Sequence, residues 1–292
     1  MLLSRPFTQI IDFVLFSNIF IACCAMAQVG LTYLLLNTPI DYPTVFFTGC
    51  GTLFLYNFSM IMAKPANPLA SPHRRVHWIY SHYRLVLFVS AFALVAMVPL
   101  AFRFSIPTLT LLALTGLIAI SYNRPLFRSL SNLRNLPGAK LFIISIVWTL
   151  SCVCVPIVEL GARGYAVTWT DTFLLATKRF MFITAITIPF DIRDLFQDKK
   201  YNLKTLPVLL GGKKSLLLCQ SLLIMYIAIL LIFVDQISSD TIALILVTLL
   251  TGWLIFKSKW KKNEYFYFLF LDGTLILQFL SVFIFHLLTG SL

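Results

Sequence analysis

The 292-residue chain has few charged residues and very few acidic ones. Only 12% of its residues are charged, and 11 acidic side chains stand against 23 Lys and Arg, a formal net charge of +12. No stretch is polar over enough length to build a separate soluble domain. Together with 59% hydrophobic residues and a mean hydropathy of +0.90, this excludes disordered, collagen-like and nucleic-acid-binding proteins. It predicts a single integral-membrane domain over residues 1–292.

The sequence also lacks a cysteine pattern and a signal-peptide pattern. All six cysteines lie inside apolar runs, without the spacing of a disulfide framework or a zinc site. The first apolar run follows Arg5, has about the length of a membrane span and has no small-residue cleavage pattern after it. We therefore expect this run to form the first membrane helix.

Long apolar runs are what the sequence does have. A spanning helix needs about 20 mostly apolar residues, and nine runs approach or exceed that length. They cover residues 10–36, 43–63, 84–102, 106–122, 140–158, 172–190, 214–234, 240–256 and 265–288. Pro, Gly and Asn lie in the connections between them. The pattern predicts an all-α polytopic membrane protein with about nine transmembrane helices.

The basic residues alternate from one connection to the next. If the N-terminus is cytoplasmic, nineteen of the 23 Lys and Arg fall on the cytoplasmic side, and the other connections hold mainly acidic residues. The positive-inside rule then places the N-terminus and these connections in the cytoplasm, and the C-terminus outside. We expect a multi-pass protein of a bacterial plasma membrane, whose basic loops also meet anionic lipid headgroups.

Three aspartates at the cytoplasmic end of the sixth run carry the strongest chemical signal. Asp191, Asp194 and Asp198 are spaced i, i+3 and i+7, which on one helix puts them within an arc of about 60°. Carboxylates held this closely suit Mg²⁺, which in turn takes phosphate oxygens. Arg193 is expected on another side of the helix, and Lys204 lies among lysines that would surround a diphosphate. The alternative is a solvated helix end whose charges neutralise each other.

Other charges lie inside the apolar runs. Lys178 and Arg179 lie within the sixth run, and Asp12 and Asp272 lie in the first and the last. An Arg at mid-membrane depth normally faces a polar cavity, where an anionic substrate would be its partner. The alternative is that residues 171–178 form an outer loop and that the span is short, with snorkelling ends.

These motifs resemble the UbiA superfamily of intramembrane prenyltransferases over nearly the whole chain. The resemblance rests on DxxDxxxD followed by K-T-L-P-V-L-L-G at 204–211, on Tyr122-Asn123-Arg124-Pro125, on a Trp148-bearing helix, and on Asp272-Gly273. It implies a helical bundle around a lipid-accessible cavity, where two aspartate-rich motifs on cytoplasmic loops hold Mg²⁺ and a polyprenyl diphosphate. Loss of the diphosphate would leave an allylic cation, which an aromatic or lipid acceptor captures.

The first of those two motifs lacks its carboxylates. Asn57 matches the motif, but Phe58, Ile61 and Pro65 occupy its aspartate positions, and no Asp or Glu occurs between Asp41 and Glu159. In one interpretation, basic residues of this loop contact the diphosphate directly and replace the missing metal charge. In the other, the protein is a diverged homologue that binds an isoprenoid diphosphate or an anionic lipid without turnover. An anion or lipid transporter is a third possibility.

The resulting hypothesis is a Mg²⁺-dependent prenyltransferase whose partners are a polyprenyl diphosphate, a membrane-soluble acceptor and the bilayer, with no nucleic acid and no obligate protein partner. The predicted metal ligands are Asp191, Asp194 and Asp198. The predicted diphosphate contacts are Arg193, Lys204, Lys64, Arg74, Arg75 and Arg124. The predicted polar residues of the cavity are Asn57, Tyr122, Arg179 and Asp272.

Overall fold

The fold was analysed in a computed structural model, which describes residues 5–62, 64–65, 67–68, 73–123, 138–200, 203–233, 236–258 and 263–289. All regular secondary structure in these ranges is helical. The longer helices coincide with the nine predicted runs. They are α1 (Arg5–Phe16) with α2 (Ile19–Leu35), α3 (Tyr42–Met62), α5 (Tyr83–Ala101), α6 (Ile106–Asn123), α7 (Ala139–Thr149) with α8 (Val155–Ala162), α9 (Trp169–Arg193), α12 (Gly212–Ile232), α13 (Ser239–Lys257) and α14 (Gly273–Thr289).

Seven helical segments within the described ranges are long and apolar enough to cross a membrane. Two of them contain a π-helical turn, at Leu150–Cys154 between α7 and α8 and at Phe266–Leu271 before α14. The α1–α2 pair passes the same test together, and α6 is a shorter apolar helix. Large apolar side chains on the outer surfaces of α5 and α12 are exposed, among them Phe88, Phe92 and Ile224. Such surfaces suit lipid contact, and the protein is an integral membrane protein.

The first predicted run is broken, although we expected one continuous helix over 10–36. α1 and α2 are bent by 61° at the break. Asn18 lies at the break in the left-handed conformation, with φ of 68°. Asn tolerates this conformation better than most residues. The break directs the Asn18 side chain toward α3, where it contacts Asn57.

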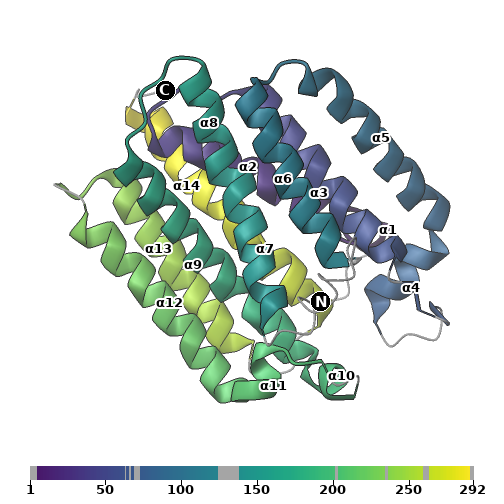
Figure 1. The fold of residues 1–292 in the computed structure, drawn as a ribbon. Coiled ribbons are helices and arrows are strands. Elements are labelled where there is room, and N and C mark those ends of the chain that lie inside the picture. Colours follow the sequence, from purple (N-terminus) through teal and green to yellow (C-terminus); the bar gives the residue numbers. More distant parts are fainter. Residues whose placement is uncertain are drawn as a thin grey trace.

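The long helices surround α2 (Figure 1). α2 packs against α3 and α14; the ring continues through α13, α12, α9, α7 and α6, and α6 returns to α3, while α5 packs on α3. Most of α2 is buried, and its small residues allow neighbouring helices to approach closely. At Gly30, for example, a Cβ would lie 2.7 Å from Cε2 of Phe279 on α14.

Three short helices lie in the connections at one end of the bundle, which we call the cavity end (Figure 1). They are α4 (Arg74–Ser81), α10 (Leu195–Lys200) and α11 (Leu206–Leu210). Because α9 ends at Arg193 and α10 begins at Leu195, Asp198 belongs to a different helix from Asp191. The expectation that three aspartates share one face of one helix is therefore wrong.

Candidate functional site

A cavity of about 780 Å³ opens at the cavity end. Of the residues that the structure describes, eight charged ones line it: Lys64, Arg75, Lys140, Asp191, Arg193, Asp194, Lys204 and Asp272. Its remaining wall is largely apolar and includes Ile143, Val147 and Trp148 of α7 and Ile183 and Ile186 of α9. Val147 lies eight residues into α7, about 12 Å from its first turn. The cavity thus combines charges at the helix ends with an apolar interior, which suits an amphiphile with an anionic head.

Asp191 is the most deeply buried carboxylate of this cavity. Its side chain is 2% exposed, and Lys140 Nζ lies 2.7 Å from its Oδ1. The contact joins α9 to the first turn of α7. The sequence analysis did not assign Lys140 to the site, because nothing in the sequence pairs positions 51 residues apart.

Arg193 faces the same cavity, although we expected it on another side of the helix. Its guanidinium holds Asp194 through two hydrogen bonds, of 2.7 Å from Nε and 2.9 Å from Nη2. The guanidinium carbon also lies 5.1 to 5.5 Å from the ring centroids of Phe190, Tyr267 and Phe268. These rings hold the side chain against the bundle, so it turns back over the helix end.

Arg75 reaches the cavity from α4. Its Nη2 donates a 2.6 Å hydrogen bond to Oδ1 of Asn18, and Asn18 Nδ2 donates one of 2.7 Å to Oδ1 of the fully buried Asn57. Its guanidinium carbon lies 4.7 Å from the ring centroid of Phe268. Burial, together with the nearby charge of Arg193, lowers the pKa of Arg75. Asn57, the one matching residue of the altered first motif, therefore supports Arg75 indirectly, through Asn18.

The helical residues just before the π-helical turn at Phe266–Leu271 anchor α4. Glu264 accepts a hydrogen bond of 2.9 Å from the Arg75 backbone N–H and lies 3.2 Å from Nδ1 of His73. Burial opposes the charged form of Glu264, but these bonds outweigh it and lower the pKa of the carboxyl. Asp12 accepts hydrogen bonds from Tyr265 and Arg74. Sequence reasoning missed Glu264 and Asn18, because neither belongs to a recognisable motif.

Several predicted site residues lie elsewhere. Arg74 pairs with Asp12 at 2.6 Å, its side chain is 55% exposed, and it is not part of the cavity wall. Asp198 accepts a 3.0 Å hydrogen bond from Thr205 Oγ1 and is also outside the wall, and burial raises its pKa. Arg179 is buried between α9 and α2, where its Nη2 lies 3.1 Å from the Gln28 carbonyl oxygen.

The remaining predicted residues are Lys64, Lys204, Asp272, Tyr122 and Arg124. The first three line the cavity. The side chain of Tyr122 and all of Arg124 lie outside the described residues.

The carboxylates fit a Mg²⁺ ion only in part. Among the described residues, no three His, Cys, Asp or Glu side chains are arranged to hold a metal ion. Asp191 and Asp194 both line the cavity, but each is paired with a cation of the chain. Mg²⁺ commonly takes one or two carboxylates and completes its shell with substrate phosphates and water. The donor set therefore fits one ion bound together with a phosphate ligand.

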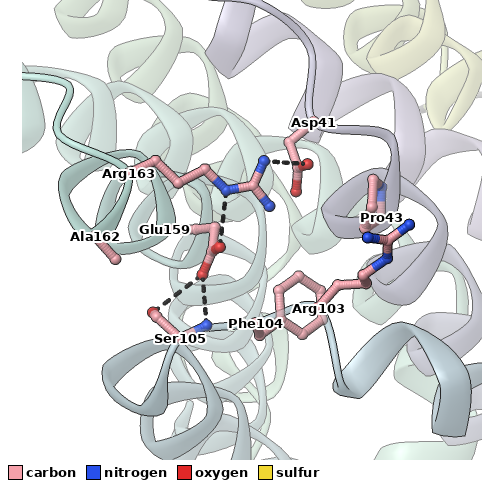
Figure 2. Close-up of a pocket in the computed structure, with 8 residues that line it drawn as sticks. All are labelled: Asp41, Pro43, Arg103, Phe104, Ser105, Glu159, Ala162 and Arg163. Atoms are coloured by element: carbon pink, nitrogen blue, oxygen red, sulfur yellow. Dashed lines mark hydrogen bonds and ion pairs between the residues drawn. The ribbon is translucent and has the colours of Figure 1, made fainter.

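A second pocket, of about 540 Å³, lies at the opposite end of the bundle (Figure 2). Arg163 bridges two carboxylates there, at 2.8 Å from Asp41 and 3.0 Å from Glu159. Glu159 also accepts hydrogen bonds of 3.1 Å from the backbone and the hydroxyl of Ser105. These contacts join the start of α3, the start of α6 and the end of α8.

Comparison with solved structures identifies the architecture. The structure matches a UbiA homologue from Archaeoglobus fulgidus bound to GPP and Mg²⁺, with a TM-score of 0.65, 13% identity, and coverage of 94% of this chain and 98% of that chain. The chain has the UbiA fold. The UbiA homologue from Aeropyrum pernix K1 matches with a TM-score of 0.63 at 16% identity, over 91% of this chain and 97% of the other.

A digeranylgeranylglyceryl phosphate synthase structure also shares the UbiA fold, with a TM-score of 0.57 at 16% identity and coverage of 94% and 96%. No protein-family model and no curated protein matches the sequence. The fold implied by the sequence resemblance is therefore confirmed, over more than nine-tenths of the chain.

Proposed function

We propose that the protein is a member of the UbiA superfamily and an intramembrane prenyltransferase, which transfers a prenyl group from a polyprenyl diphosphate to a membrane-soluble acceptor. The observation that carries the proposal is the composition of the 780 Å³ cavity, with charges at its mouth and an apolar, aromatic interior. The fold supports it, since UbiA homologues of this fold are bound to GPP or DMAPP with Mg²⁺.

The charged mouth suits the leaving group. Among the described residues, five cations line the cavity against three carboxylates, so a diphosphate would meet an excess of positive charge. Lys140 can turn from Asp191 to phosphate oxygens, after which Asp191 would hold Mg²⁺ together with Asp194. The ion would supply charge stabilisation to the departing pyrophosphate. Arg75 and Lys204 would bind and orient the same group.

The apolar interior suits the prenyl chain. Trp148 and Phe190 line it, and aromatic faces stabilise a developing allylic cation. Apolar walls also exclude water, which would otherwise capture the cation before the acceptor does. The cavity end would face the cytoplasm of a bacterium, because the basic connections gather there.

Binding without turnover is the second candidate. It is favoured by the missing carboxylates of the first motif and by the cations that already pair with Asp191 and Asp194.

The two candidates separate in one assay. Detergent-purified protein is incubated with labelled farnesyl or longer diphosphates, Mg²⁺ and membrane extract, and both pyrophosphate and prenylated lipid are measured. A prenyltransferase releases pyrophosphate in step with a labelled lipid product. Measurable binding with pyrophosphate release equal to the protein-free control supports the binding protein instead.

A further inference from the structure

Two guanidinium groups from different helices line the cavity together, and neither forms a hydrogen bond to Asp272, the carboxylate nearby, among the described contacts. Arg75 from α4 and Arg193 from α9 both lie over the Phe268 ring, with centroid distances of 4.7 and 5.5 Å. Burial and the positive charge of Arg193 lower the pKa of Arg75, although the carboxylates of Asp272 and Glu264 act in the opposite direction. Like charges held together away from bulk water are costly unless an anion lies between them.

Each guanidinium also keeps a buried, unused donor. Arg75 Nε and Arg193 Nη1 have no hydrogen-bond partner among the described residues. Arg193 uses its other nitrogens on Asp194, and Arg75 uses Nη2 on Asn18. No ion pair among the described residues involves the Arg75 guanidinium. Buried donors in a native structure are normally satisfied, so these two mark the place of a missing acceptor.

A chain of hydrogen bonds holds Arg75 in place. Asn57 holds Asn18 and Asn18 holds Arg75 through two short hydrogen bonds, while Glu264 fixes the Arg75 backbone. A chain of buried polar contacts of this kind fixes a side chain in one orientation. Arg75 therefore occupies a defined position on the side of the cavity where the first motif has no carboxylate.

We propose that Arg75 and Arg193 together hold one phosphate group of the diphosphate directly, without a metal ion between them, and that Asn18 is the positioning residue for Arg75. A tetrahedral phosphate offers two guanidinium groups enough oxygen acceptors for both unused donors. The proposal rests on the proposed function, since it assigns the diphosphate to the same cavity. It predicts that part of the binding free energy is independent of Mg²⁺.

The test is equilibrium binding of labelled farnesyl diphosphate to the purified full-length protein, in EDTA and in excess Mg²⁺. We expect wild type to keep measurable binding in EDTA. Arg75→Gln should weaken binding by about tenfold or more in both conditions, because a charge-assisted hydrogen bond is lost. The affinity of Arg75→Lys should lie between those of wild type and Arg75→Gln, since lysine keeps the positive charge but not the planar set of guanidinium donors.

Asn18 is tested by Asn18→Gly, which tolerates the positive φ and removes only the side chain. We expect a loss of about threefold to tenfold in EDTA, and no additional loss when Asn18→Gly is combined with Arg75→Gln, because a positioning residue acts only through its partner. A purely structural residue would give additive losses. Arg103→Gln, in the connection after α5 at the opposite end of the bundle, is the matched control and should bind like wild type.

The outcomes are distinct. Binding by wild type in Mg²⁺ that vanishes in EDTA, or equal affinities of wild type and Arg75→Gln, overturns the guanidinium pair and leaves the proposed function standing. Absence of binding in both conditions overturns the proposed function itself. Elution of each variant as a monodisperse peak, as for wild type, shows that a loss is not due to misfolding.

Discussion

The two ends of the bundle use charge in opposite ways. At the opposite end, Arg163 is shared between Asp41 and Glu159, and the other oxygen of Glu159 accepts two hydrogen bonds from Ser105 (Figure 2). The pocket there is lined by two cations and two carboxylates. At the cavity end, the described lining holds five cations and three carboxylates, and two guanidinium donors have no partner within it.

This difference separates a structural contact from a binding site. Where positive and negative charges are equal in number and bond to each other, the bonds stabilise the fold by holding helix connections together. Where cations outnumber carboxylates and some donors have no partner, those groups can bind an anionic ligand. The comparison assigns stability to the opposite end and ligand binding to the cavity end, and variants at both ends can test it.

The largest effect is expected for Asp191→Asn. The change keeps the shape of the side chain but removes a buried charge that would hold Mg²⁺, so prenyl transfer should fall by about 100-fold or more. The control is Asp171→Asn near the other end of the same helix, where the side chain is exposed; its turnover should stay close to that of wild type. Equal losses in both variants would contradict the division between the two ends.

Glu159→Gln should have an intermediate effect, on stability alone. It removes a charged partner of Arg163 and Ser105, which should cost about 1–3 kcal/mol of folding free energy. A thermal unfolding scan should show a midpoint lower by a few degrees, with farnesyl diphosphate affinity unchanged. A loss of affinity with an unchanged midpoint would show that the outer cluster serves ligand binding.

The smallest effect is expected for Asp198→Asn, because Asp198 bonds Thr205 and lies outside the cavity wall. The Mg²⁺ concentration for half-maximal binding of farnesyl diphosphate should change by less than about threefold, since only a neutral hydrogen-bonding group replaces the carboxylate. If Asp198→Asn and Asp191→Asn changed this Mg²⁺ concentration equally, the result would instead support the three-carboxylate metal site predicted from the sequence.

Much of the fold was predictable because hydrophobic length is a strong signal. The run predicted over 43–63 is observed as Tyr42–Met62, and the run over 240–256 as Ser239–Lys257. The break at Asn18 was missed, since the surrounding apolar composition does not change there. The helix end at Arg193 was also missed: charged residues continue through it, and the spacing of three aspartates suggested one continuous helix.

The site was most predictable where it lies within one motif, although Lys64, Arg75 and Asp272 were also predicted and line the cavity. Asp191, Arg193 and Lys204 were found from a short stretch of sequence, and all three line the cavity. Lys140 and Glu264 were missed because their roles come from contacts between distant helices, which a single sequence does not encode in its spacing. Arg74 and Arg75 are adjacent and equivalent in sequence, and only the fold shows which of them turns inward.

The most direct test of the account is a structure of the protein with a non-hydrolysable farnesyl diphosphate analogue and Mg²⁺. We predict the diphosphate at the cavity end, with phosphate oxygens within hydrogen-bonding distance of Arg75 and Arg193, and the prenyl chain along α7 toward Trp148. A diphosphate bound in the pocket of Asp41 and Glu159, or a cavity end left empty at saturating ligand, would contradict the account.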